Sequence, residues 1–124
     1  MAWKGVIIEE SLEDMSLLDM ISVEGTVKEY LEEEAKRGKM TLHRFFLDEK
    51  RKSEFVRRAK KAVRKGWYIH ICRFGTMIVI FRDRSFQFTK NNTDIIRKAE
   101  EYGKSMGILP VQMGFIGMID IPWG

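Results

Sequence analysis

The chain contains very little cysteine or proline and no long apolar run. Its 124 residues include one cysteine, Cys72, and two prolines. One cysteine cannot form an intrachain disulfide. The longest apolar run, Met77 to Phe81, is far shorter than the roughly 20 residues of a membrane span. The first residues also carry acids where a secretory signal would be apolar. We therefore expect a cytoplasmic protein with no membrane partner.

Motifs for catalysis or metal binding are also missing from the sequence. It has no CxxC, no HxxxH and no glycine-rich phosphate loop, so we expect no cofactor and no metal. His43, His70 and Cys72 are the residue types that suit zinc or a Cys–His nucleophile, and His70 and Cys72 share one strand face by their spacing. A lone cysteine, however, is usually a small buried hydrophobe. Runs of acids such as Glu9–Glu10 are ordinarily solvated surface. The sequence therefore favours a protein that is not an enzyme.

The overall composition is that of a globular domain. Apolar residues make up 44% and charged residues 32% of the chain, which is too apolar for a disordered protein. The length suits one domain over residues 1–124, divided into an N-terminal extension (1–38) and a core (39–124). The abundance of Lys and Glu with few Asn and Gln is typical of thermophile proteins.

Charge is distributed very unevenly along the sequence. The net charge of +4 combines −8 in residues 1–34, +13 in residues 35–90 and −1 in residues 91–124. Residues 50–66 alone carry nine basic side chains and one acid, Glu54. Such asymmetry indicates an anionic partner or charge complementation within the chain.

The pattern after residue 39 predicts alternating strands and helices. Residues 40–48 read as a strand that ends at a helix-capping Asp48, and a helix follows, with Gly66 ending it. Its apolar stripe is formed by Phe55, Val56, Ala59, Ala62 and Val63.

The rest of the core continues the alternation. Residues 67–73 and 77–81 form a predicted hairpin, with the second strand running on through Phe88. A second helix lies within 93–106, stopped by Gly107, and 108–121 form a last extended segment. The resulting order, βαββαβ, predicts an α+β fold of the ferredoxin-like type, with one antiparallel sheet and two helices on one face.

Both faces of the predicted sheet are apolar. Trp67, Ile69 and Ile71 alternate with Tyr68, His70 and Cys72 along one strand. Because the predicted helices cover only one face, the other needs a cover from the N-terminal segment, a second subunit or a ligand.

The N-terminal segment is harder to assign. Residues 3–8 suit a strand, and Ser11 with Asp14 resembles a capping box before a short helix. Residues 22–38 fit either a helix or the first arm of a hairpin with 40–48, and the turn-forming Gly38 favours the hairpin.

Two functions follow from these features. The first is a non-enzymatic protein that binds nucleic acid, RNA before DNA, through phosphate contacts of a basic surface. That surface comprises Lys50, Arg51, Arg57, Arg58, Lys61, Arg64, Lys65, Arg73, Arg82 and Arg84. A solvated helix face, matched by the acidic N-terminal region, is the plainer interpretation of the same residues. The second function is a homo-oligomer that binds a small ligand at a subunit interface, through the second sheet face.

Overall fold

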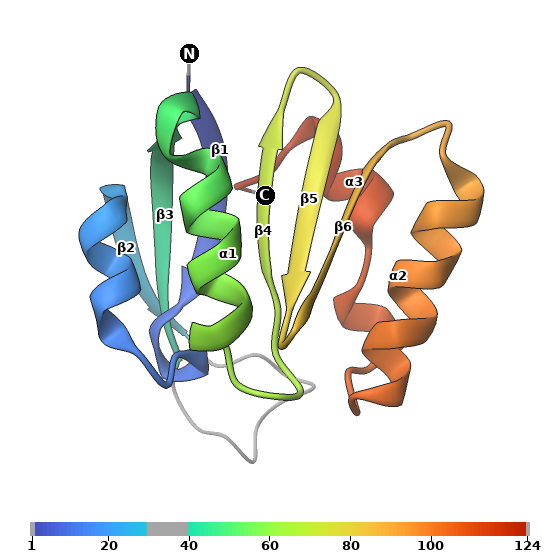
Figure 1. Cartoon of the computed structure of the whole chain (residues 1–124), viewed down its shortest axis with the longest axis horizontal. Helices are drawn as coiled ribbons and strands as arrows, with labels where there is room; N and C mark the ends of the chain where they lie inside the picture. The colour runs from blue at the N-terminus through green and yellow to red at the C-terminus, as the bar shows by residue number, and fades with distance from the viewer. Residues whose placement is uncertain (1, 30–39, 124) are drawn as a thin grey trace.

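The computed structural model describes residues 2–29 and 40–123. In this part of the chain six strands form one antiparallel sheet in the order β2-β3-β1-β4-β5-β6 (Figure 1). The strands are β1 Ala2–Ile8, β2 Ser22–Glu29, β3 Met40–Asp48, β4 Ile69–Arg73, β5 Thr76–Phe81 and β6 Arg84–Thr89. The helices are α1 Lys52–Ala62, α2 Thr93–Ser105 and α3 Phe115–Asp120. Short 3₁₀ turns are η1 Glu9–Ser11, η2 Met15–Met20, η4 Glu49–Arg51 and η5 Pro110–Gln112.

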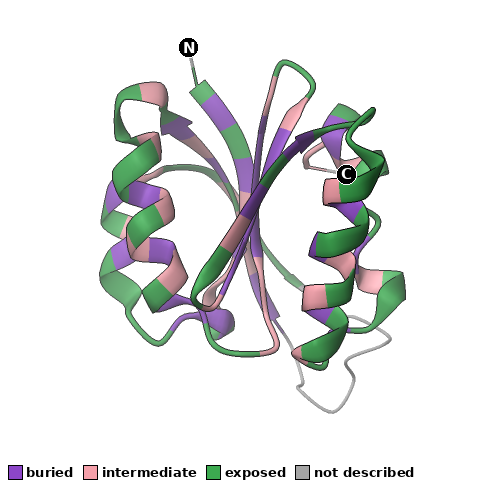
Figure 2. Ribbon diagram, turned by 45° about the vertical axis from the view of Figure 1, so that its right-hand side comes forward, coloured by how far each residue is buried: buried purple, intermediate pink, exposed green. Residues whose placement is uncertain are grey.

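Helices cover both faces of the sheet. Alternation along the strands sends Phe45 and Ile71 to the face covered by α1 and η2, where they pack with Phe55. Met77 and Phe81 point to the opposite face and pack with residues of α2 and α3, including Phe115. Figure 2 shows the result: buried residues lie toward the sheet and the outer sides of the helices are exposed.

The central strand, β1, lies between β3 and β4. Val6 is opposite Arg44 on one side and His70 on the other. At Gly5 the packing is so close that a Cβ atom would lie 2.5 Å from the carbonyl oxygen of His70 and from a ring carbon of Phe45. The residues expected as an acidic extension therefore supply a strand at the middle of the sheet.

The predicted α+β class is confirmed, but the ferredoxin-like arrangement is not found. Six strands lie in the order given above, and helices lie on both faces. Residues 108–121, expected as an extended segment, form η5 and α3 instead. Phe115 and Ile119 are four residues apart and both buried, which is helical spacing over a short stretch. Three nearby glycines and Pro110 obscured that pattern in the sequence.

The predicted continuous strand from Met77 to Phe88 is also wrong. Arg82 and Asp83 form a two-residue turn between β5 and β6, and Asp83 has a φ of 68°. Aspartate tolerates this left-handed conformation better than most residues. The predicted hairpin of β4 and β5 is confirmed, with Phe74 and Gly75 at φ values of 48° and 76° as a type I′ turn requires.

The first helix is shorter than predicted. It ends at Ala62, whose carbonyl oxygen accepts a hydrogen bond from the amide of Glu13, 2.7 Å away. Val63 is extended and bridges Leu12, so a long-range backbone contact ends the helix before Gly66.

The N-terminal predictions have mixed outcomes. The strand at residues 3–8 and the hairpin of residues 22–29 with 40–48 are confirmed, while residues 30–38 lie outside the described part. Asp14, rather than Ser11, caps the short helix by accepting a hydrogen bond from the amide of Ser16. No helix in the described residues is long and apolar enough to cross a membrane.

Candidate functional site

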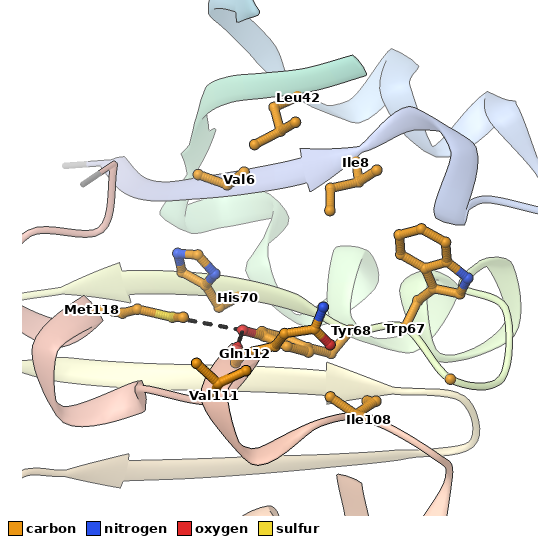
Figure 3. Close-up of a pocket in the computed structure, with 11 residues that line it drawn as sticks. Val6, Ile8, Leu42, Trp67, Tyr68, His70, Ile108, Val111, Gln112 and Met118 are labelled. Carbon is orange, nitrogen blue, oxygen red and sulfur yellow. Dashed lines mark hydrogen bonds between the residues drawn. The ribbon is translucent and has the colours of Figure 1, made fainter. Parts of the chain in front are cut away.

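A cavity of about 310 Å³ lies beside β1, on the sheet face that carries α3. On that face α3 packs against β4 and β5. The C-terminal segment covers β4 and β5 on this face. The cavity lies at the edge of that segment, next to the side chains of β1 and β3. It is lined by Val6, Ile8, Leu42, Gly66, Trp67, Tyr68, His70, Ile108, Val111, Gln112 and Met118. Figure 3 shows the side chains of β1 and β3 on one side and those of residues 108–112 on the other.

The lining is apolar and has no charged side chain among the described residues. Strand alternation explains this, because even-numbered residues of β1, β3 and β4 all point to this face. Val111 is 66% exposed and marks the rim. The size is at the lower end of the roughly 300–1,000 Å³ usual for ligand pockets.

His70 is the buried polar side chain of the cavity wall, only 7% exposed. Its Nε2 lies 2.9 Å from the carbonyl oxygen of Pro122, in the tail after α3. Burial lowers the pKa of His70 below its ordinary value of 6.5, against the smaller opposing effect of the Pro122 carbonyl. The imidazole is therefore neutral near pH 7.

Tyr68 lies beside His70 in the same wall and contacts the segment that forms the other wall. Its hydroxyl donates a hydrogen bond to the backbone carbonyl of Gln112 and lies 3.9 Å from the sulfur of Met118. Its ring packs edge-on against Phe115, with centroids 5.5 Å apart. Burial raises the pKa of Tyr68, so the phenol stays protonated. This hydrogen bond ties η5 to the residue immediately before β4.

The C-terminal tail after α3 packs on the sheet beside the cavity. Trp123 Nε1 donates a hydrogen bond of 3.0 Å to the carbonyl oxygen of Gly5. The indole packs edge-on against Phe46, at 5.0 Å between centroids, and Lys4 Nζ lies 5.0 Å from its centroid. Together with the bond from His70 to Pro122, these contacts fix the tail across β1 and β4.

Sequence reasoning placed His70, Cys72 and His43 in one candidate cluster, and the structure divides them. Cys72 shares the face of His70, and its thiol donates to the carbonyl oxygen of Met118 at 3.6 Å. Burial raises the pKa of the Cys72 thiol from 9.0 to about 12, which suits a small hydrophobe and not a nucleophile.

His43 lies on the opposite face of the sheet. Its Nδ1 hydrogen-bonds with Thr26 Oγ1 at 2.8 Å, and its Nε2 lies 3.6 Å from Glu9 Oε1. Among the described residues no group of three or more His, Cys, Asp or Glu side chains is arranged to hold a metal ion.

The predicted basic surface is divided by contacts within the chain. Arg58 donates to Ser16 Oγ at 3.0 Å and Arg51 to the carbonyl oxygen of Met20 at 3.3 Å. Arg57 lies 3.8 Å from Glu54, although both side chains are exposed. The turn η2 thus packs along α1 and accepts hydrogen bonds from part of the basic surface.

The three arginines expected to extend that surface also have partners. Arg73 pairs with Glu49 at 2.9 Å, and Arg82 pairs with Glu13 at 2.8 Å. Arg84 lies over the Phe86 ring, 4.7 Å from its centroid, on the sheet face opposite α1. Lys50, Lys61, Arg64 and Lys65 are exposed and have no side-chain hydrogen bond or ion pair with the described residues.

A second hollow, of about 440 Å³, lies at the other end of β4. Its lining includes Lys4, Arg73 and Asp120. Two of these charges are already neutralised, Arg73 by Glu49 and Asp120 by Lys90. Unlike the cavity at His70, this hollow has charged walls, and its described lining residues present no buried polar side chain comparable to His70.

Sequence reasoning missed the cavity because its wall contains η5 and α3, which were predicted as one extended segment. One signal was present: Tyr68, His70 and Cys72 were assigned to a sheet face that needed a cover. That cover comes from residues 108–123 of the same chain. No protein-family model, no curated protein and no solved structure matches this chain.

Proposed function

We propose that this protein binds a small apolar molecule in the cavity beside β1. The observation that carries the proposal is an apolar cavity of about 310 Å³ with one buried, neutral histidine in its wall and no charged lining among the described residues. Small-molecule sites have this composition: apolar walls and a few placed polar groups. Binding is favoured over catalysis because the nearby thiol of Cys72 is protonated and hydrogen-bonded.

The volume sets the size of the ligand. At about 30 Å³ per water molecule in the liquid, 310 Å³ corresponds to about ten non-hydrogen atoms. At about 0.5 kcal/mol per atom such a ligand binds with about −5 kcal/mol, or a Kd of roughly 0.2 mM. Binding of that strength is measured well by NMR titration.

The test is a titration of ten-atom apolar compounds into the protein and two valine variants. Val6→Phe adds a ring to the cavity wall and is expected to abolish saturable binding. Val23→Phe is the matched control, since Val23 is 47% exposed and pairs with Phe45 on the face that carries α1. Equal affinity in both variants, or no saturable binding to the unmodified protein, contradicts the proposal.

Nucleic-acid binding remains a second candidate, and a specific observation supports it. Lys61, Arg64 and Lys65 are exposed near the end of α1 and make no side-chain hydrogen bond or ion pair within 4 Å with the described residues, although the charge of Arg64 acts on Glu13. A phosphate backbone is the anion that such a group suits, and its binding weakens with salt by about 0.9 log units per contact and per log unit of salt.

Fluorescence anisotropy with single-stranded RNA, duplex RNA and duplex DNA over a salt series tests this candidate. The variant Lys61→Glu/Arg64→Glu is expected to lose binding. Lys98→Glu on α2 is the control, being an exposed lysine on the other face. No binding at low salt rejects nucleic acid as a partner. A homo-oligomer through the second sheet face stays a prediction, to be tested by light scattering.

A further inference from the structure

The hydrogen bond between His70 and Pro122 determines the form of the imidazole. A backbone carbonyl oxygen can only accept, so the proton of this 2.9 Å contact is on Nε2. The ring is buried, and its pKa is lowered by that burial. The imidazole is therefore the neutral Nε2–H tautomer, and Nδ1 carries a lone pair.

Nδ1 has no hydrogen-bond partner among residues 2–29 and 40–123. Figure 3 shows the ring standing in the cavity wall, with one nitrogen toward the middle of the cavity and one away from it. Nε2 is the nitrogen bonded to Pro122, which leaves Nδ1 as the nitrogen available to the cavity. Among the described residues His43 Nε2 is the one buried side-chain nitrogen or oxygen without a hydrogen-bond partner, so His70 Nδ1, which is also unpartnered, is accessible from the cavity. A ligand that donates to Nδ1 gains about the net free energy of one hydrogen bond.

The nearest hydroxyl in the cavity cannot satisfy Nδ1. Tyr68 donates its proton to the carbonyl of Gln112, and the rings of Tyr68 and His70 are 6.4 Å apart between centroids. With its proton engaged, the Tyr68 oxygen retains only acceptor capacity. Two acceptors thus face the same apolar space.

We propose that the ligand is an apolar alcohol or phenol whose hydroxyl donates a hydrogen bond to His70 Nδ1. This inference rests on the proposed function and specifies the chemistry of its ligand. An ether of similar size lacks the donor and makes no hydrogen bond to Nδ1. A carboxylate at pH 7 has only acceptor oxygens and is repelled by the lone pair of Nδ1.

The test compares ligands of similar size with and without the donor. The probes are 4-ethylphenol with 4-ethylanisole, and 1-octanol with dibutyl ether, titrated at pH 7.5. The donor-bearing member of at least one pair is expected to bind about fivefold to tenfold more tightly, the usual size of one net hydrogen bond. The pair that shows the larger ratio distinguishes an aromatic from an aliphatic ligand.

The variant His70→Gln separates the acceptor from the tail contact. The glutamine amide can still donate near the position of Nε2 to Pro122, but it places no acceptor at Nδ1. In this variant the alcohol or phenol and its ether partner are expected to bind with about equal affinity. A preference that persists in it overturns the assignment of Nδ1.

The ¹⁵N resonance of His70 Nδ1 provides a readout in the unmodified protein, should the variant not fold. It is expected to shift with 4-ethylphenol and not with 4-ethylanisole, while His43 on the opposite face stays unchanged. Equal binding of both members of each pair overturns this inference and leaves the proposed function standing. No saturable binding of any probe overturns both.

Discussion

Cys72 shows how burial alone can decide the chemistry of a residue. It is the only cysteine in the sequence, and its thiol, 4% exposed, donates to the carbonyl oxygen of Met118. Because its pKa is raised to about 12, almost no thiolate forms at pH 8. We expect 5,5′-dithiobis(2-nitrobenzoate) to modify Cys72 of the folded protein only as fast as the protein unfolds locally and exposes the thiol. Fast, stoichiometric modification without denaturant contradicts this burial.

Gly5 tests the close approach at the centre of the sheet. A Cβ atom there would meet the backbone of β4 and the Phe45 ring at 2.5 Å, and the backbone cannot move without loosening the pairing of β1 with β4. Gly5→Ala is therefore expected to lower the free energy of unfolding by about 2–3 kcal/mol in urea denaturation. Gly25→Ala in β2 is the control, since no atom lies within 4 Å of its added Cβ, and a change below about 0.5 kcal/mol is expected.

Single residues were predicted from sequence with uneven success. The turn at Phe74–Gly75 was correct because its signal is local. Asp48 does form a cap, but of the 3₁₀ turn η4 before α1, and α1 itself has no side-chain cap. The face shared by His70 and Cys72 followed from alternation alone. The role of Pro122 and Trp123 was not predictable, because their partners His70 and Gly5 are 52 and 118 residues away in sequence.

At the scale of elements, the C-terminal tail is attached to the sheet beside the cavity, through its hydrogen bonds with His70 and Gly5. Trp123→Phe keeps a ring against Phe46 but removes the hydrogen bond to Gly5. We expect the free energy of unfolding to fall by about 1 kcal/mol. Exchange of the backbone amides of Ile121 and residue 123 should accelerate as well.

Ile121→Ala in the same tail is the matched control. Ile121 is 62% exposed, so its truncation should change the free energy of unfolding by less than about 0.5 kcal/mol. An equal loss in both variants would show that the hydrogen bond to Gly5 does not hold the tail.

Long strands and helices, whose apolar residues recur at regular spacing, were recognised from the sequence. The short helix α3 was not. Strand β3 and helix α2 follow their predicted ranges closely, since alternation and the i, i+4 spacing run over nine and thirteen residues. Helix α3 has six residues, too few for its period to outweigh the signals of its glycines. Helix α1 ended early because of contacts with residues 11–13, which a local pattern does not contain.

For the whole molecule, the titrating groups predict two stages of acid destabilisation. Below pH 6.5 the unfolded chain protonates His70 before the folded chain does, because the folded pKa is lower, so the free energy of unfolding falls with pH. The pKa of Glu13 is lowered by the hydrogen bond from Arg82 and its charge, and that of Asp14 by hydrogen bonds from Ser16. Their contribution is present above their ordinary pKa values of 4.5 and 3.8 and is lost as pH falls through the lower folded values.

Urea denaturation at pH 7.5, 5.5 and 4.0 checks both stages. His70→Gln is expected to flatten the dependence between pH 7.5 and 5.5 and to leave the change below pH 5 intact. An unaltered slope in that variant would show that His70 does not cause the first stage.

The order of the strands in the sheet could not be predicted from the sequence, because it depends on pairing between strands that are far apart along the chain. The α+β class followed from the alternation of periods. The central position of β1, between strands that begin 38 and 67 residues later, has no local signal. That order forms the cavity, because it places β1 next to β4, at the edge of the region that the C-terminal segment covers.

The most direct measurement of the central claim is an intermolecular NOE experiment with ¹³C-methyl-labelled methionine and 4-ethylphenol. Met118 lines the cavity, whereas Met15 is 45% exposed in η2, which packs with α1 on the other side of the sheet. The account predicts NOEs from the ligand to the Met118 methyl group, saturable and absent at Met15. NOEs at Met15 without any at Met118, or none at either under saturating ligand, would contradict it.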